Sequence, residues 1–289
     1  MFIDINHMTR YDLYNKTYQR GSYHACAKGK HAWTVTVGEK GQMTPILTVE
    51  NLIKTYPAFR LGPISFQVEA GSIMGFIGRN GAGKTTTLKS ILSIAHPDSG
   101  SIRYFGQELP GNERAIKQRV GFASGAVDYY PRKKIADIIA VTRNFYDNWD
   151  DAAYRKYMGI FSIDPQKTPR ELSEGMKVKL NLAIALSHQA ELLILDEPTS
   201  GLDPVSREEL LEIFAALKEC GVAILFSTHI TSDLDKCADY ITYIKKGELV
   251  ASDTMEYFLS GHRMRGAGGN LEEIMLHYEK EDYREKLAE

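Results

Sequence analysis

Residues 78–85 read Gly-Arg-Asn-Gly-Ala-Gly-Lys-Thr and fit the pattern GxxxxGK followed by Ser or Thr. Glycines let the backbone curl until its amide groups point inward at phosphate oxygens. The lysine is a point charge for the β- and γ-phosphates, and the Thr85 hydroxyl is a ligand for Mg²⁺. The helix-like segment that follows would present its positive end to the same anion. The sequence therefore predicts a phosphate loop that binds nucleotide through Gly78, Arg79, Asn80, Gly81, Ala82, Gly83, Lys84, Thr85 and Thr86.

Two carboxylates and a histidine follow later apolar runs. Residues 192–195 are followed by Asp196 and Glu197, and residues 222–228 by His229. Such strand ends face the ligand crevice of a parallel sheet. Asp196 is suited to hold Mg²⁺ through water, Glu197 to orient or deprotonate an attacking water, and His229 to donate near a γ-phosphate. The alternatives are acids that simply end a strand in solvent and a structural histidine.

The order of the elements predicts an α/β fold. Residues 46–56 and 62–72 alternate apolar and polar side chains like two half-buried antiparallel strands. Residues 72–77 form a continuous apolar run, as expected of a parallel strand covered on both faces. Asp203-Pro204 is an N-cap with proline at the first helical position, between two further apolar runs. Strand, helix and strand in this order predict a parallel sheet with right-handed crossovers.

Three parts are predicted along the chain. Residues 1–42 lack sustained periodicity and are expected to form a disordered N-terminal extension. Residues 43–261 are expected to form the main domain, in which a helical subdomain occupies about residues 110–185. Residues 262–289 are expected to form a short C-terminal helical tail, with an amphipathic helix over 271–278 that docks on the main domain.

Composition excludes several classes of protein. With 43% hydrophobic and 25% charged residues the chain resembles an ordinary soluble globular protein. A net charge of -2 argues against nucleic-acid binding by bulk electrostatics. The three cysteines are far apart and favour a reducing cytosol over a disulfide framework. No stretch approaches the roughly 20 apolar residues that cross a bilayer, so work at a membrane would need a partner.

Five motifs occur in one order along residues 46–260: Gly78 to Thr86, Leu172-Ser-Glu-Gly-Met176, LLILDEP ending at Pro198, Ser200-Gly-Leu-Asp203, and His229. Together they resemble the ATP-binding-cassette (ABC) ATPases. The segments FYDNWD, LAIALSH and FSTHITSDLDKCADYI are similar to single-domain bacterial subunits of the bacitracin-resistance and Ytr types. The resemblance implies a P-loop NTPase of ABC type, with a mixed sheet core, an antiparallel β subdomain and an inserted helical subdomain.

The resemblance also implies roles for individual residues. Tyr56 would stack on adenine, with an ordinary strand-end aromatic as the alternative. Glu197 would be the catalytic base and His229 the γ-phosphate switch. Ser173 and Gly175 would cap the ATP that is bound by a second cassette. Lys84 would serve catalysis as well as binding, and Thr85 and Asp196 would serve the metal.

On this interpretation the chain is the ATP-binding and ATP-hydrolysing subunit of an ABC transporter, with ATP and Mg²⁺ as cofactors. It would dimerise around two ATP, as a homodimer or with a related cassette, and Asp203 would lie at the dimer interface. It would drive a membrane-spanning permease on a separate chain, with export favoured over import. No nucleic-acid partner is expected. The expected location is cytoplasmic and peripheral, on the inner face of the cell membrane.

Two departures from the family pattern predict slow basal hydrolysis. Gly125 stands where the family has a glutamine that contacts metal, and Asp128 is a weak candidate to replace it. Glu174 adds negative charge to the signature segment, close to the expected phosphate site.

Two other classes of function stay open on the residues alone. One is a soluble regulatory or mechanical ABC ATPase, which a single cassette without sustained heptads disfavours. The other is a small-molecule kinase, which the signature segment and the adjacent Asp196 and Glu197 disfavour. The aromatic residues between 129 and 149 would either dock a membrane partner or pack the core of the helical subdomain.

Overall fold

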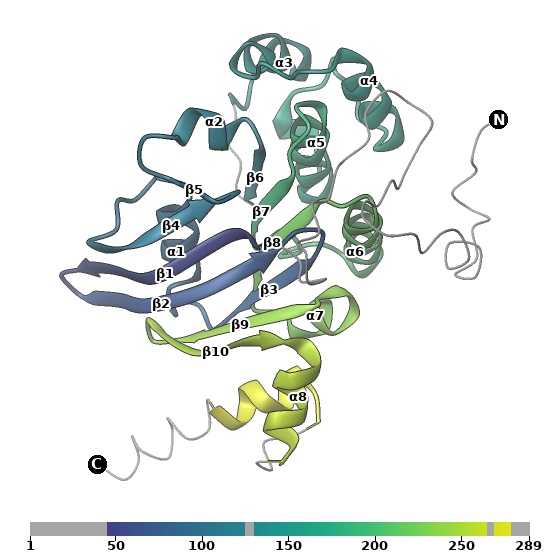
Figure 1. The fold of residues 1–289 in the computed structure, drawn as a ribbon. Helices are drawn as coiled ribbons and strands as arrows, with labels where there is room; N and C mark the ends of the chain where they lie inside the picture. The colour runs from purple at the N-terminus through teal and green to yellow at the C-terminus, as the bar shows by residue number, and fades with distance from the viewer. Residues whose placement is uncertain (1–44, 125–129, 265–268, 279–289) are drawn as a thin grey trace, which may run out of the picture.

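The computed structural model in Figure 1 describes residues 45–124, 130–264 and 269–278 of the chain. The predicted extension over residues 1–42, and the positions Gly125 and Asp128, lie outside the described residues. Two sheets and a group of helices make up the described part. The predicted α/β class, with a mixed sheet, an antiparallel sheet and inserted helices, is confirmed.

The larger sheet has six strands in the order β10-β9-β3-β8-β7-β6. Its strands are β3 (Ile73–Ile77), β6 (Val120–Ser124), β7 (Leu192–Asp196), β8 (Ala223–Thr228), β9 (Tyr240–Lys245) and β10 (Glu248–Thr254). All neighbouring pairs are parallel except β9 and β10, which form an antiparallel hairpin. The order is not sequential, so the ends of β3, β7 and β8 meet although they are far apart along the chain (Figure 1).

The smaller sheet is antiparallel, in the order β2-β1-β4-β5. Its strands are β1 (Pro45–Tyr56), β2 (Phe59–Glu69), β4 (Ser99–Tyr104) and β5 (Gln107–Glu108). The pairing of β1 with β2 confirms the two antiparallel strands predicted from the alternating pattern. The short connection between them places Tyr56 directly opposite Phe59.

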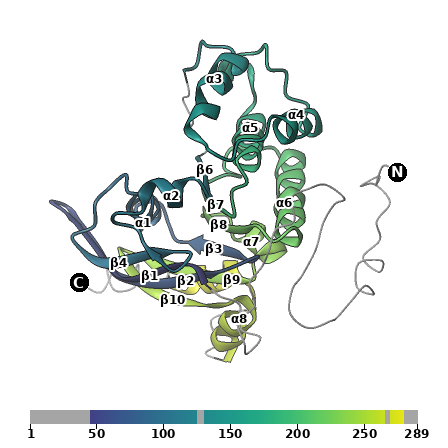
Figure 2. The same cartoon turned by 45° about the horizontal axis from the view of Figure 1, so that its top comes forward.

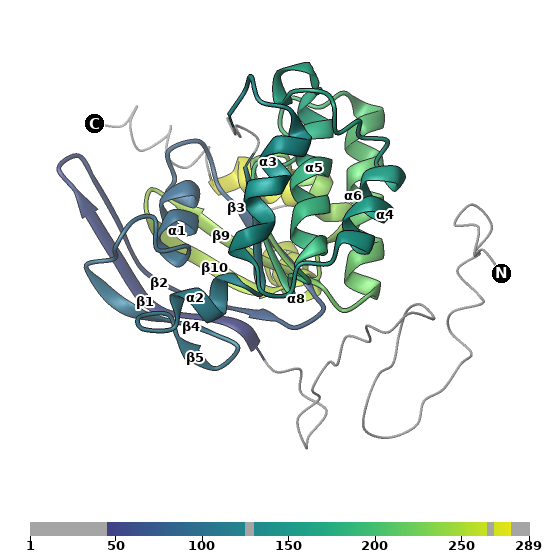
Figure 3. The ribbon, with the colours of Figure 1, turned by 90° about the horizontal axis from the view of Figure 1, so that it is seen from above.

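Helices occupy the connections between strands. They are α1 (Lys84–Ile91), α2 (Glu113–Lys117), α3 (Ile135–Thr142), α4 (Asp151–Ile160), α5 (Glu174–Ser187), α6 (Pro204–Glu219), α7 (Thr231–Cys237) and α8 (Met255–Met264), with short 3-10 turns η2 (Arg143–Phe145) and η3 (Pro169–Glu171). Viewed from above, α3, α4, α5 and α6 gather on one side of the molecule, and β1, β2, β4 and β5 lie on the other (Figure 3).

The six-stranded sheet separates two apolar cores. Alternate side chains of β3 point to opposite faces of the sheet. Met74 and Phe76 lie in the core shared with the antiparallel sheet and α1. Ile73 and Ile77 lie in the core shared with α5, α6 and α7. All five residues of β3 are buried. This explains the continuous apolar run, because a strand covered on both faces needs apolar side chains on both. The strand that leads into the phosphate loop is thus enclosed on both faces, as is β8 beside it.

A third core holds the helices α3, α4 and α5 together, and it includes Ile135, Ile139, Met158 and Leu180. Figure 2 shows these helices standing away from the antiparallel sheet. The predicted start of the helical subdomain at about residue 110 precedes β6, which pairs with β7 in the main sheet. The buried residues of the third core begin at Ile135.

The C-terminal end of the described chain packs on the main sheet. Residues 271–278 are helical, and Leu271 and Ile274 are fully buried in the core beneath α7 and α8. Lys245 Nζ, from β9, donates to Tyr278 O at 3.0 Å. None of the helices in the described ranges is both long and apolar enough to cross a membrane.

Candidate active site

The phosphate loop joins β3 to α1 and is fixed by the neighbouring strand. Ala82 N donates to Arg79 O at 3.0 Å, and Gly247 N, in the turn after β9, donates to Ala82 O at 2.9 Å. A Cβ atom on Gly78 would lie 2.3 Å from Ile244 O, so the loop backbone approaches β9 too closely for a side chain at that position. Two strands of the sheet therefore set the shape of the loop.

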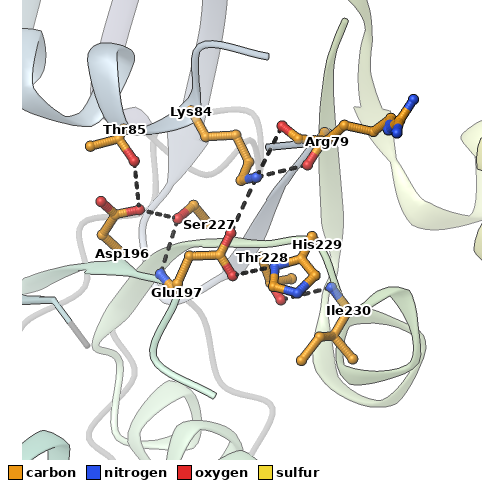
Figure 4. Close-up of polar contacts among 10 residues, drawn as sticks. Arg79, Lys84, Thr85, Asp196, Glu197, Ser227, Thr228, His229 and Ile230 are labelled. Carbon is orange, nitrogen blue, oxygen red and sulfur yellow. Dashed lines mark hydrogen bonds and ion pairs between the residues drawn. The ribbon is translucent and has the colours of Figure 1, made fainter. Parts of the chain in front are cut away.

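Lys84 begins α1 and turns its side chain back into the loop, with 5% of the side chain exposed (Figure 4). Its Nζ donates to Gly78 O at 2.7 Å and, more weakly, to Arg79 O at 3.4 Å. The same nitrogen lies 3.2 Å from Glu197 Oε1. A nearly buried ammonium group needs such partners, because leaving it unpaired costs several kcal/mol, on the order of 3–5.

Asp196 is the last residue of β7, and its carboxylate faces the start of α1 (Figure 4). Its Oδ1 accepts a short hydrogen bond of 2.6 Å from Ser227 Oγ and a long one of 3.4 Å from Thr85 Oγ1. The parallel register pairs Asp196 with Ser227 on β8. The carboxylate is therefore held from the sheet side and touched by the hydroxyl that follows Lys84.

Glu197 leaves the strand with a left-handed backbone, at φ 51°. This conformation is uncommon for a residue other than glycine and turns the Glu197 side chain toward Lys84. Its Oε2 lies 2.9 Å from His229 Nδ1. Lys84, Glu197 and His229 thus form a continuous chain of polar contacts across the ends of three strands (Figure 4).

Tyr56 lies outside this cluster, at the end of β1, with 41% of the residue exposed. The Lys54 ammonium group lies 5.6 Å from the centre of the Tyr56 ring. Its cross-strand partner Phe59 reaches the loop, because a Cβ atom on Gly83 would lie 3.1 Å from Phe59 Cζ. The hairpin therefore places Phe59 against the phosphate loop, with the exposed Tyr56 opposite Phe59 on the neighbouring strand.

Ser173 and Gly175 lie at the beginning of α5. Ser173 is the N-cap, and its side chain accepts a hydrogen bond from Met176 N at 3.3 Å. Gly175 faces α6, since a Cβ atom there would contact Leu202 and Ser206 at 3.6 and 3.7 Å. The structure thus places the signature segment beside the start of α6 and not within the cluster of Figure 4.

Two acidic side chains in or beside the signature segment, Glu174 and Asp203, have ionic or hydrogen-bonding partners. Glu174, in the first turn of α5, forms an ion pair with Lys177 at 2.6 Å. Asp203 caps α6 by accepting hydrogen bonds from Val205 N and Ser206 N at 3.0 Å each, which confirms the predicted N-cap. Hydrogen bonds from Ser206 hold the pKa of the Asp203 carboxyl below its usual range.

Curated relatives of this chain are ATP-binding proteins of transporters. The chain is 32% identical to the bacitracin transport ATP-binding protein BcrA of Bacillus licheniformis over 225 residues, which is 76% of this chain and 74% of that protein. It is 35% identical to the Nod factor export ATP-binding protein I of Burkholderia lata over 193 residues, which is 65% of this chain and 64% of that protein. The ABC transporter family model matches residues 61–200.

The chain belongs to the ATP-binding subunits of ABC transporters. Solved structures agree: the ATP-binding subunit of an ABC transporter superposes with a TM-score of 0.71 at 28% identity, covering 80% of this chain and 98% of that one. A nucleotide-free cassette of an ABC transporter shares the fold, with a TM-score of 0.66 at 19% identity. As an ABC ATP-binding subunit, the protein binds ATP and is an ATPase.

The side chains present in this ABC subunit fit a phosphate group and a divalent cation. Lys84 is a buried cation whose partners are two carbonyls and a carboxylate, so an anion can replace the carboxylate. Thr85 Oγ1 and the carboxylate of Asp196 are oxygen donors, the type that Mg²⁺ prefers. Mg²⁺ is usually bound by one or two protein oxygens together with substrate phosphates and water.

Two contacts of the ABC subunit were not predicted from the sequence. Ser227 bonds to both acidic residues of the site, and Phe59 lies against the phosphate loop. A signal for Ser227 exists, because it ends an apolar run, as Asp196 does. That Ser227 pairs with Asp196 follows only from the sheet register. The position of Phe59 against the loop depends on the length of the turn after Tyr56, and the alternating pattern does not determine that length.

Proposed function

We propose that this chain holds Mg·ATP in the cluster of Figure 4 and hydrolyses it as half of a cassette dimer that drives a separate membrane permease. The single observation that supports this best is the convergence of Lys84, Asp196, Glu197 and His229 at the ends of three neighbouring strands. Phosphoryl transfer depends on positioning and on charge stabilisation, and this cluster supplies both a buried cation and an oriented carboxylate.

Binding begins at the loop in this proposal. Lys84 and the amide groups of residues 78–86 hold the phosphates, assisted by the positive end of α1. Tyr56 stacks on the adenine, whose face is apolar like the ring of the tyrosine. Thr85 and Asp196 hold Mg²⁺, which neutralises developing charge on the phosphate oxygens. Phosphate oxygens compete with Glu197 for Lys84 and release the carboxylate for catalysis.

Hydrolysis uses the released carboxylate in this proposal. Glu197 orients the attacking water and accepts its proton as the general base. His229 holds the other oxygen of Glu197 and interacts with the γ-phosphate, so it senses whether that phosphate is present. The left-handed backbone of Glu197 supports this role, because uncommon conformations cluster at functional sites, where the surroundings hold them in place.

A second cassette completes each site in this proposal. Ser173 and Gly175 begin a helix of fourteen residues, whose N-terminus is a ready anion site. Because they lie beside α6, away from the Lys84 cluster of their own chain, they would cap the ATP of the opposite subunit. Asp203, at the start of α6, would lie at the same interface. Capping would make the dimer depend on ATP, and hydrolysis would let it open.

The proposed role in transport rests on the names of the relatives. One is named for bacitracin transport and the other for export of Nod factor, so we propose export by a permease on a separate chain. The helical subdomain, with exposed Tyr130 and Phe145, is the proposed docking side. The cassette would then work in the cytoplasm, on the inner face of the cell membrane. Gly125 and Glu174 would keep basal hydrolysis slow, and the ion pair with Lys177 would offset part of the Glu174 charge.

The first test is the purified Glu197→Gln variant, followed by size exclusion with and without Mg·ATP. We expect the variant to lose hydrolysis, to bind ATP and to dimerise only when ATP is present. A variant that binds ATP but stays monomeric would sink the homodimer and require a related cassette or the permease. A variant that hydrolyses ATP like the wild type would remove Glu197 as the base. Failure of both proteins to bind ATP would overturn the phosphate-loop assignment.

A further inference from the structure

Ser227 occupies the space between the two acidic residues of the site. Its side chain is fully buried at the end of β8. Its hydroxyl donates to Asp196 Oδ1 at 2.6 Å and accepts from Glu197 N at 3.1 Å. Glu197 N also donates to Ser227 O at 3.0 Å. One serine therefore contacts both the side chain of the first acid and the backbone of the second (Figure 4).

The bond to Asp196 fixes which oxygen of that carboxylate is occupied. A carboxylate can rotate about its terminal torsion, which has broad minima. The only other side-chain donor to Asp196 within the described chain is Thr85 Oγ1 at 3.4 Å, which is long for a hydroxyl donor. Hydrogen bonds to ionised groups are about twice as strong as neutral ones. The short bond from Ser227 therefore decides the orientation of Asp196, and it leaves Oδ2 free of protein donors in Figure 4.

The hydrogen bond from Glu197 N fixes the backbone conformation directly after β7. Glu197 has φ 51°, so the chain turns sharply between the two acids. In this conformation the amide of Glu197 points back to β8 and is shared between the carbonyl and the hydroxyl of Ser227. The hydrogen bond to Ser227 O joins two backbone groups, so it does not depend on the side chain at position 227. The hydroxyl bond depends on the identity of the side chain.

The geometry points to Ser227 as a positioning residue for the metal, one that holds the Asp196 carboxylate beside the Thr85 hydroxyl, where the proposed function puts Mg²⁺ bound with ATP. This inference rests on the proposed function, since it takes Asp196 as the residue that serves the metal. Without the Ser227 hydroxyl, Asp196 would lose its short hydrogen bond, and its carboxylate would be free to rotate about the terminal torsion out of this position. Binding of ATP through Lys84 and the loop amides does not involve Ser227, so only the metal-dependent part of affinity should change.

The test compares Ser227→Ala with Ser227→Thr, which keeps the hydroxyl, and with Thr242→Val as the matched control. Thr242 is also fully buried in the same sheet, and its hydroxyl bonds to Ser252 and Met74 outside the site. For each full-length variant, the affinity for ATP is measured by calorimetry with Mg²⁺ and with EDTA. The melting temperature without nucleotide and the kcat and KM of hydrolysis are measured alongside.

We expect Ser227→Ala to lower the ATP affinity in Mg²⁺ by about tenfold, the size of one hydrogen bond to a charged group, and to leave the affinity in EDTA unchanged. Its kcat should fall at least as far, and Ser227→Thr should restore both quantities. Thr242→Val should lower the melting temperature as Ser227→Ala does, without changing the ratio of the two affinities.

Three outcomes contradict the inference. The first is a ratio of affinities in Mg²⁺ and EDTA that is the same in Ser227→Ala as in the wild type. The second is an equal change of that ratio in Thr242→Val. The third is a folded Ser227→Thr variant that does not restore the ratio. Each removes Ser227 from metal positioning and leaves the proposed function standing. Failure of the wild type to bind ATP under both conditions would instead overturn the proposed function itself.

Discussion

The ammonium group of Lys84 has little access to water, and its partners belong to two different motifs of the sequence. Gly78 O comes from its own loop, and Glu197 comes from the end of β7. Since a buried charge that loses its partner is costly, each member of this cluster stabilises the position of the others. Individual residues here are therefore coupled, and substitutions among them are not expected to be additive.

At the residue scale, two glycines of the phosphate loop allow a matched comparison. Gly78→Ala would force a Cβ atom to within 2.3 Å of Ile244 O, a backbone atom of β9 that cannot move freely. Gly81→Ala meets no atom within 4 Å and carries only the strain of φ 82°. We expect Gly78→Ala to lower the free energy of unfolding by about 3 kcal/mol and Gly81→Ala by about 1 kcal/mol. Urea unfolding of the nucleotide-free proteins measures both.

Equal losses in the two variants would contradict the close approach of the loop to β9. Nucleotide affinity is not the readout in this comparison, because both glycines lie where phosphate is proposed to bind. A fold that tolerates Gly78→Ala as well as Gly81→Ala would mean that the loop can withdraw from the sheet.

At the element scale, His188 joins the end of α5 to two other segments. Its ring stacks on Tyr146, with 3.8 Å between ring centroids and 6° between planes. Its Nδ1 lies 3.0 Å from Gln118 O, just before β6. The side chain of Gln118 bonds in turn to Phe145 O and Asp147 N at 2.8 Å. These contacts connect the helical subdomain to the edge of the main sheet.

Burial lowers the pKa of His188 to about 4, whereas a histidine in the unfolded chain titrates near 6.5. Between these values the unfolded state binds more protons, so stability falls as the pH falls. We expect His188 to account for a loss of about 2–3 kcal/mol between pH 7 and pH 4.5. Urea unfolding at both pH values measures it. His188→Phe, which keeps a ring on Tyr146, should lose less over the same interval; an identical pH dependence would show that His188 does not titrate on unfolding.

Elements differ in how far the sequence predicts them. The order of β3, phosphate loop and α1 is evident because each local pattern agrees with its neighbours. The position of β6 is not, since a five-residue strand between helices carries too little periodicity to show that it extends the main sheet beyond β7. The acids and His229 were predicted because they end apolar runs. Ser227 also ends an apolar run, but its role was not predicted, because the pairing with Asp196 follows only from the sheet register.

At the scale of the whole molecule, the arrangement of two surfaces determines what an active unit must be. The cluster around Lys84 lies at the ends of β3, β7 and β8, whereas Ser173 and Gly175 lie where α5 meets α6. The proposed function requires both for each ATP. In a symmetric dimer, the Lys84 cluster of each copy would face the signature segment of the other copy, which gives two complete sites. An isolated chain would have no complete site.

Mixing two inactive variants tests this arrangement. Lys84→Ala disables the phosphate loop, and Ser173→Arg disables the signature segment, so each homodimer has two defective sites. A mixed dimer has one site with both defects and one site with neither, and we expect phosphate release to return on mixing. The control mixes Lys84→Ala with Glu197→Gln, whose defects belong to the same cluster and leave every site damaged. If the first mixture is as inactive as the control, the signature segment acts on the ATP of its own chain, or this cassette pairs with a different one. Restored release in the first mixture alone would instead require each site to be built from two copies of this chain, because no single copy in that mixture is intact.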